Sequence, residues 1–257
     1  MRMPANERRD LILREVVAKG RIGVTELSAI LGVTTETVRK DVRELVEVGA
    51  VAKRHGYVIS ASPLAESAFS EKEGVRAQEK AEVARRALDL VPEGGSIFLD
   101  TSTTVLALAR LLVVRSGLTI ATNSIDICQA LARSDNDLLV MGGDLRRRSN
   151  SCVGAWALAA ADQLNVDVAF MGADGASATG PTVRSSRELD LKGRIVRRAG
   201  RAAVLMDTSK LSHQGLYTFC DWSEVDALVC ERALAEEERD VLPDSLAILP
   251  SVDEPRE

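Results

Sequence analysis

The chain has 257 residues, of which 46% are hydrophobic and 28% are charged. This composition is typical of a globular protein with one large or two smaller domains, and it excludes a fully disordered chain. The sequence contains no apolar run of ~18 residues, and residues 1–10 are charged where a signal peptide would be apolar. We therefore expect a cytoplasmic protein with no membrane partner.

The cysteines do not point to a metal site. Cys128, Cys152, Cys220 and Cys230 form no Cys-x-x-Cys pair, and the chain has only two histidines. Structural zinc needs about four such ligands, so we expect no metal, no cofactor and reduced thiols.

The net charge of −5 is unevenly distributed. Residues 1–60 contain 11 Lys and Arg against 8 Asp and Glu, a net charge of +3, which leaves −8 for the remainder. The two Trp, two Tyr and four Phe are too few for a platform that stacks single-stranded bases. A basic head thus precedes an acidic body, and the head is the candidate for nucleic-acid contact.

Apolar spacing and glycine stops predict three helices in the head, at 6–19, 26–31 and 35–48. Thr25 and Thr34 are candidate caps for the second and third. Segments 50–52 and 57–59 are strand-like and flank a basic hairpin tip. We assign residues 1–60 to this domain.

The second and third predicted helices form a helix-turn-helix with Gly32 at the turn. A recognition helix contacts base edges with its N-terminal residues, which here are Thr35, Glu36, Thr37 and Arg39. The residues expected to contact phosphates are Lys40, Arg43, Lys53 and Arg54. The alternative is a polar helix face that is merely solvated.

The run from Arg8 to Tyr57 resembles the N-terminal winged helix-turn-helix of the DeoR family of bacterial repressors. The matching motifs are Val24-Thr25-Glu26-Leu27, Leu31-Gly32-Val33-Thr34, Thr37-Val38-Arg39-Lys40-Asp41-Val42 and Arg54-His55-Gly56. The family usually has a second glycine where this chain has Tyr57. The resemblance implies binding to double-stranded operator DNA.

Residues 61–74 are rich in Ser, Glu and Ala and are the expected linker, and residues 75–257 form the body. Strand-like and helical runs alternate in the body, which predicts an α/β domain with a mostly parallel sheet. Expected strands are 96–99, 118–122, 138–141, 166–171, 202–206 and 225–230, and expected helices are 105–112, 125–132, 156–164 and 189–199.

Small and polar residues follow these strands, where ligands bind in such sheets. Asp100, Ser102, Thr103 and Thr104 precede a helix whose free backbone N–H groups can hold a phosphate. Further candidates for effector binding are Asn123, Gly143, Asp174, Glu188 and Lys210. Any one of these loops could be an ordinary turn in which glycine, Asp and Asn have no functional role. Glu188 and Lys192 could form an ion pair on the helix surface.

These clusters also resemble, in order, the C-terminal sensor domain of the DeoR family, which is related to ribose-5-phosphate isomerase and coenzyme A transferases. The resemblance spans about residues 6–231 and implies a phosphorylated sugar or sugar acid as effector. The family commonly has glycine in place of Ser102. Arg146, Arg147 and Arg148 either contact a second ligand charge or form an exposed basic run, so we leave them outside the site.

An isomerase needs a base and a cation. Glu188 could be the base, but no lysine lies between Asp174 and Glu188, and Arg184 is a poor substitute. His213 has no partners by spacing. We therefore predict no catalytic residues.

The sequence predicts a homo-oligomeric DNA-binding repressor, a dimer or tetramer, of carbohydrate catabolism genes, released by a sugar-phosphate effector. Two alternatives remain. One is a phosphosugar isomerase-like enzyme with a DNA-binding or structural head, and the other is an interaction protein whose winged helix contacts protein.

Overall fold

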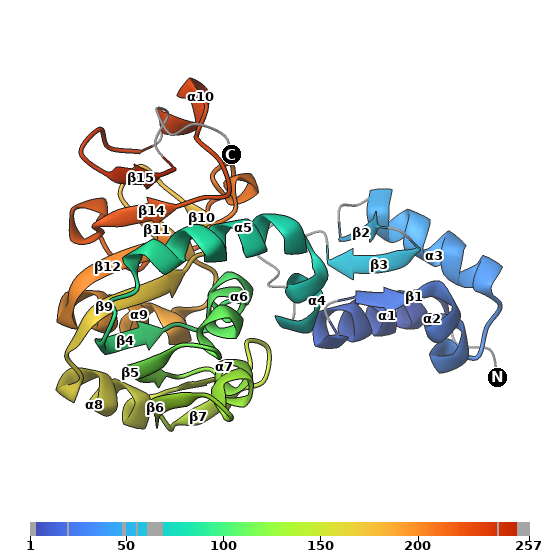
Figure 1. Ribbon diagram of the computed structural model, residues 1–257. Helices are drawn as coiled ribbons and strands as arrows, with labels where there is room; N and C mark the ends of the chain where they lie inside the picture. Colours follow the sequence, from blue (N-terminus) through green and yellow to red (C-terminus); the bar gives the residue numbers. More distant parts are fainter. Residues whose placement is uncertain are drawn as a thin grey trace. The chain divides into compact units, whose positions relative to one another are not determined.

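The computed structural model describes residues 4–19, 21–47, 50–54, 56–60, 69–240 and 242–250, and it divides into two compact units after residue 68 (Figure 1). The second unit starts with helix α4 (Phe69–Gly74), inside the expected linker. The sequence argument missed this helix because Phe69 is its only apolar residue. That side chain is buried in the core of the second unit.

The first unit packs three helices against a small antiparallel sheet of strand order β1-β3-β2. Its elements are α1 (Ala5–Lys19), β1 (Arg21–Gly23), α2 (Val24–Leu31), α3 (Thr35–Glu47), β2 (Val51–Arg54) and β3 (Tyr57–Ser60). The core includes Ile12, Leu27, Val38, Val42 and Val58, each with an exposed fraction of 0%. The four helical residues among these occupy the apolar positions that the helical spacing predicts, and Val58 adds the buried face of β3.

Local features of the first unit match the sequence at two places and differ at two. Gly32 ends α2 in the left-handed region with φ 62°, and the Thr37 N–H donates to Thr34 Oγ1 at the start of α3. The expected Thr25 cap is wrong, because α2 begins at residue 24 and Gly23 is its N-cap. Strand β1 was not expected, since three residues are too few to show a period.

A seven-stranded sheet forms the centre of the second unit, with strand order β15-β14-β12-β9-β4-β5-β6 and only parallel pairs. Its strands are β4 (Gly95–Leu99), β5 (Ser116–Thr122), β6 (Asp135–Val140), β9 (Val166–Gly172), β12 (Ala199–Leu205), β14 (Ala227–Val229) and β15 (Ala247–Leu249). The parallel α/β class is therefore confirmed. Six of these strands coincide with predicted apolar runs, and β15 was not predicted.

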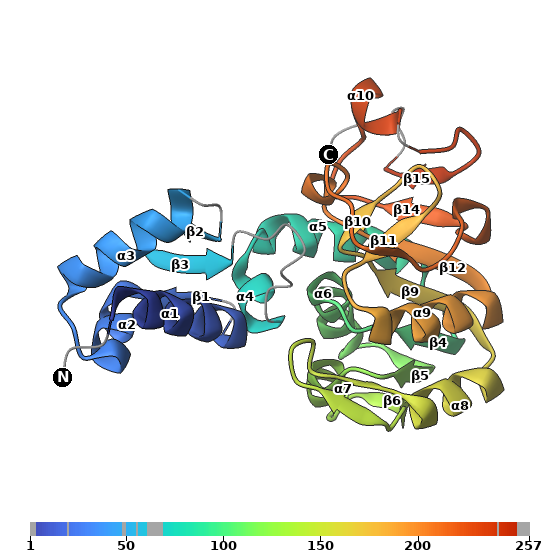
Figure 2. The same cartoon turned by 180° about the vertical axis from the view of Figure 1, so that it is seen from behind.

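Helices cover both faces of this sheet (Figures 1 and 2). The helices α5 (Ala77–Ala87), α6 (Thr103–Leu112) and α7 (Ile125–Leu131) pack on one face, and α8 (Ala155–Gln163) and α9 (Ser186–Arg198) pack on the other. Alternation along β4 shows why: Ile97 and Leu99 join the core under α6, whereas Phe98 joins the core under α9. Burial of both faces explains the near-continuous apolar strands.

The strand order reverses between β4 and β9, which brings the loops after these two strands together. Short elements surround this carboxyl edge: the hairpin β7 (Asp144–Arg146) and β8 (Ser151–Val153), and the sheet β10 (Gly175–Ala176), β11 (Pro181–Val183) and β13 (Tyr217–Thr218). The remaining elements are η1 (Leu88–Leu90), η2 (Thr208–Lys210), η3 (Trp222–Glu224) and α10 (Glu236–Arg239).

None of the helices in the described ranges is long and apolar enough to cross a membrane. The same ranges contain no cluster of His, Cys, Asp and Glu that could hold a metal ion. All four cysteines are free thiols, and three of them are buried.

Candidate DNA-binding surface and effector site

Helix α3 exposes the charged residues predicted to contact DNA. Arg39 and Arg43 have 55% and 61% of their side chains exposed, and both face Glu36 at 3.5 and 3.6 Å. Lys40 is exposed beside them, and Thr35 and Thr37 are half-buried. On the opposite side, the buried Asp41 accepts hydrogen bonds from Arg8, which joins α3 to α1. The basic face of α3 is therefore accessible, whereas the buried Asp41 links α3 to α1 within the fold.

The β2–β3 hairpin is the wing. Lys53 is exposed, and Arg54 is in β2, paired with Tyr57 across the hairpin. The side chain of Arg54 lies outside the described part of the structure. Tyr57, which replaces the family's glycine, lies under the Arg21 guanidinium at 4.8 Å from the ring centroid. This cation–π contact gives Tyr57 a packing role in the wing.

The second unit contains four lysines, and all four lie at the carboxyl edge of its sheet. Three of their ammonium groups contact residues in the loops after β4 and β9, and the fourth donates to a backbone carbonyl of α4. These lysines are Lys72, Lys80, Lys192 and Lys210. In an acidic unit, this arrangement concentrates positive charge at the place where the sequence predicts the effector.

Asp100 and Lys192 form a buried ion pair at the centre of the site, with side-chain exposures of 2% and 3%. The Lys192 Nζ also donates to the Gly172 carbonyl at 2.9 Å, and the Gly172 N–H donates to Asp100 Oδ2 at 2.9 Å. Although burial alone would lower it, the carboxylates of Asp100 and Glu188 raise the pKa of Lys192. The surface-pair interpretation of Lys192 is therefore wrong.

Asp174 lies beside two further lysines. Lys72 Nζ donates to Asp174 Oδ1 at 2.8 Å, the Arg184 N–H donates to Oδ2 at 3.1 Å, and Lys210 Nζ donates to the neighbouring Ala173 carbonyl at 2.7 Å. Burial would raise the pKa of Asp174, yet the Lys72 ammonium holds it well below its ordinary value. Asp174 is thus an ionised hydrogen-bond acceptor next to the ammonium groups of Lys72 and Lys210.

Burial disfavours the protonated form of the other two lysines, Lys80 and Lys210. Burial, together with the charge of Lys210, lowers the pKa of Lys80 from 10.5 to about 8. Burial also lowers the pKa of Lys210. A bound anion would relieve both effects, because an opposite charge favours the ammonium form.

Helix α6 begins at Thr103, two residues beyond the loop positions Asp100 and Thr101, with Ser102 as its N-cap. Ser102 caps the helix, since its Oγ accepts from the N–H groups of Thr104 and Val105 at 3.2 and 3.4 Å. Thr103 and Thr104 follow in the first turn, and both are buried. A Cβ built on Gly172 would lie 2.2 Å from the Ser102 Cβ, so glycine at 172 makes room for a side chain at 102.

Two buried side-chain oxygens at this edge have no hydrogen-bond partner within the described structure: Thr104 Oγ1 and Asn123 Oδ1. The Asn123 amide nitrogen is used, since it donates to the Cys152 carbonyl at 3.1 Å. Gly143 has φ 151°, and a Cβ built there would lie 2.4 Å from the Val153 carbonyl oxygen, so glycine allows the close approach of β8. Unmatched buried polar atoms cost free energy and mark places where a ligand can bind.

Glu188 lies in α9 with 9% of its side chain exposed, and it faces Arg146 at 3.2 Å. Arg146 is 13% exposed and also donates to Ser149 Oγ at 2.8 Å. The interpretation of Arg146 as part of an exposed run is therefore wrong, although Arg147 is exposed. Arg146 was left out of the site in favour of an exposed basic run, whereas Lys72 and Lys80 gave no sequence signal because their partners Asp174 and Lys210 are remote in sequence.

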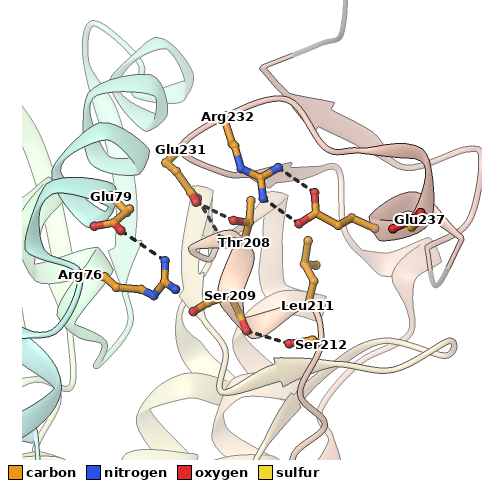
Figure 3. A pocket seen from close by; sticks show the side chains of 10 residues that line it. Arg76, Glu79, Thr208, Ser209, Leu211, Ser212, Glu231, Arg232 and Glu237 are labelled. Carbon is orange, nitrogen blue, oxygen red and sulfur yellow. Dashed lines mark hydrogen bonds and ion pairs between the residues drawn. The ribbon is translucent and has the colours of Figure 1, made fainter.

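A cavity of about 570 Å³ lies near η2, and it is separate from the predicted effector residues. Figure 3 shows Arg76 and Glu79 on one side and Glu231 and Arg232 on another. Glu231 is already occupied, because it accepts from the N–H and the hydroxyl of Thr208 at 2.9 and 2.6 Å. Arg232 is likewise paired with Glu238 at 2.7 Å.

The chain matches two families. Residues 8–63 match the DeoR-like helix-turn-helix domain, and residues 75–232 match the DeoR C terminal sensor domain. It is 29% identical to the putative aga operon transcriptional repressor of Escherichia coli O157:H7, covering 89% of this chain and 87% of the relative. It is 30% identical to the regulator IolR of Bacillus subtilis, covering 86% and 89%.

The glycerol-3-phosphate regulon repressor of Escherichia coli K12 is 26% identical, covering 88% of this chain and 90% of the relative. Among solved structures, ribose 5-phosphate isomerase A of Methanocaldococcus jannaschii aligns over 51% of this chain and 53% of its own, with 22% identity and a TM-score of 0.38. The exposed basic helix lies in the first matched domain, and Lys80, Lys192 and Lys210 of the sheet edge lie in the second. The chain belongs to the DeoR family of transcriptional regulators, with a helix-turn-helix DNA-binding domain and a C-terminal sensor domain.

Proposed function

We propose that this regulator represses carbohydrate catabolism genes and releases operator DNA when its second unit binds a phosphorylated sugar or sugar acid. The observation that carries the proposal is that three of the four lysines of the second unit contact the loops after β4 and β9, while the fourth, Lys80, contacts the Lys72 carbonyl. Two relatives support the sugar class, since they are named for the aga operon and the glycerol-3-phosphate regulon.

The site offers different groups to the two ends of such a ligand. The first turn of α6, with Thr103 and Thr104, is suited to the phosphate, because helix N-termini hold anions and Lys192 lies beside it. Asp174 and the unmatched Asn123 Oδ1 accept hydrogen bonds and suit sugar hydroxyls. Lys210 adds positive charge next to Asp174, and Asp100 holds Lys192 in place.

We infer that the site binds without turnover. An aldose–ketose isomerase needs a carboxylate that is free to remove a carbon-bound proton. Glu188, the candidate base, is instead paired with Arg146 at 3.2 Å. The competing isomerase function has one point in its favour, because Lys192 supplies the ammonium that the sequence between Asp174 and Glu188 lacks.

We further propose that the protein acts as a homo-oligomer, a dimer or tetramer. A dimer presents two recognition helices ~34 Å apart and suits half-sites separated by one turn of DNA. Release by the effector requires that it bind the DNA-free state more tightly than the operator-bound state.

The test uses duplexes that the purified full chain selects from a random-sequence library. Their affinity is measured by fluorescence anisotropy with and without a panel of sugar phosphates and aldonic-acid phosphates, while NMR follows each sugar for conversion. We expect tight duplex binding that one class of ligand weakens at least tenfold, with no conversion. Sugar conversion would contradict the sensor role, and failure to select any duplex would contradict DNA binding by this chain.

A further inference from the structure

We propose that the Lys72–Asp174 ion pair is a latch that holds α4 in the second unit, and that the effector opens it. The inference rests on the proposed function, because Asp174 is one of the groups assigned to the effector. It adds a regulatory role for Lys72, a residue outside the predicted site.

Helix α4 is held in place by few contacts. It has six residues, too few to be stable without tertiary contacts. Phe69 is its single apolar anchor, and the Phe69 N–H donates to the Arg148 carbonyl at 3.0 Å. The other described contacts are ionic or polar, so small changes in them decide whether α4 stays docked.

Three of these polar contacts connect α4 to residues of the effector site or to elements beside it. Lys72 joins Asp174 at 2.8 Å across 102 positions of sequence, with 32% and 15% of the two side chains exposed. Lys80 donates from α5 to the Lys72 carbonyl, and Glu73 pairs with Arg110 of α6, the helix whose first turn is the proposed phosphate site. The docking of α4 therefore depends on groups that a ligand would contact.

A ligand must compete for Asp174. Its second oxygen already accepts from the Arg184 N–H, so a sugar hydroxyl that donates to Oδ1 shares this oxygen with the Lys72 ammonium and weakens the ion pair. Lys72 is also the more exposed partner, and the phosphate of a bound ligand offers its ammonium a second anion with which to pair. Among the side chains of α4 that the structure describes, loss of the pair leaves Phe69 and Glu73 as the main anchors.

The position of α4 in the chain makes this change useful. It is the first element of the second unit, and residues 61–68 connect it to β3, the last strand of the DNA-binding unit. A change in the docking of α4 alters the point from which the head is tethered. The latch thus converts occupancy of the effector site into a change at the start of the connection to the wing.

The experiment measures amide hydrogen exchange by mass spectrometry on the full chain. Lys72→Met and Asp174→Asn each remove one partner, and Glu238→Gln is the matched control because it breaks a comparable ion pair with Arg232 away from α4. Without ligand, we expect exchange in residues 69–80 to rise about tenfold in both latch variants and to stay unchanged in the control. Equal protection of 69–80 in Lys72→Met and the wild type would overturn the latch.

The second arm adds glycerol 3-phosphate, D-ribose 5-phosphate or inorganic phosphate to the wild type. We expect a bound sugar phosphate to slow exchange in the loops after β4 and β9 and to speed exchange in 69–80, with no further increase in Lys72→Met. Slower loops with unchanged 69–80 would also overturn the latch. If no phosphate compound slows either loop, the proposed effector class fails, and the ligand-free variants still decide the latch.

Discussion

The buried pair of Asp100 and Lys192 sets a limit on how the effector site can be altered. Both side chains are almost fully removed from solvent, and each holds the other through direct and Gly172-mediated contacts. Removal of one partner leaves an uncompensated buried charge, which is costly. Asp100 is thus a structural residue as well as a candidate ligand contact, and simple deletion would confuse the two roles.

We expect Lys192→Met to lower the free energy of unfolding by about 3–5 kcal/mol, because Asp100 would remain buried and unpaired. The double variant Asp100→Leu/Lys192→Met should lose less than the sum of the single changes. Urea unfolding monitored by circular dichroism measures all three. Glu238→Gln, whose partner is an exposed arginine, should cost no more than about 1 kcal/mol. A loss below about 1 kcal/mol for Lys192→Met would show that the pair is not a structural centre.

On the exposed face of α3, we expect a substitution to affect DNA binding and to leave stability unchanged. Arg39→Ala should weaken binding to a selected duplex by about 1–3 kcal/mol while the melting temperature stays within error, since Arg39 is exposed and pairs only weakly with Glu36. The contrasting variant is Asp41→Ala, which removes the buried carboxylate that joins α3 to Arg8 of α1 and should lower the melting temperature. A melting temperature that falls equally in both variants would assign Arg39 to the fold and not to DNA.

Among the elements, those with a clear period could be predicted and those held by remote partners could not. The apolar run of β9 and the alternation of strands with helices follow from burial on both sheet faces. By contrast, β10, β11 and β13 are two- or three-residue strands that exist because they pair with one another. No local signal in so few residues separates them from loops.

The same distinction applies to the site. The loops after β4 and β9 were recognisable because hydroxyls and aspartates follow apolar strands directly. Lys72 and Lys80 were not, since they lie on helices before the first strand of the sheet and reach the site only through tertiary packing. Contacts between residues about 100 positions apart, such as Lys72 and Asp174, leave no trace in spacing.

The lowered pKa of Lys80 in α5 predicts that effector affinity depends on pH. Lys80, with a pKa of about 8, lies near Lys210, Asp207, Lys72 and Glu73. A bound sugar phosphate, already dianionic above pH 7, favours the protonated form of Lys80. Affinity should therefore fall as pH rises from 7.5 to 9, by about tenfold at most for one proton. Isothermal titration calorimetry should show a flat profile for Lys80→Met, and a wild-type profile as flat would exclude Lys80 as the titrating group.

At the scale of the whole molecule, the salt dependence of DNA binding reports the number of heads that contact one duplex. Each head offers four predicted phosphate contacts: Lys40, Arg43, Lys53 and Arg54. Counterion release predicts a slope of log K against log salt of about −3.6 for one head and about −7 for two. Anisotropy titrations between low and moderate salt measure the slope. A value near −3.6 would contradict paired binding by a dimer.

The scarcity of lysine in the second unit also makes the protein a convenient object for chemical footprinting. An amine-reactive reagent has only four side-chain targets in that unit, and every one lies at the sheet edge assigned to the effector. Peptide mapping after brief labelling would therefore report on this site almost without background. Acylation of lysine in the second unit would reach Lys72 first, because 32% of its side chain is exposed whereas Lys80 and Lys192 are buried. Acylation of Lys72 and its ion pair with Asp174 are therefore alternatives for the same nitrogen atom.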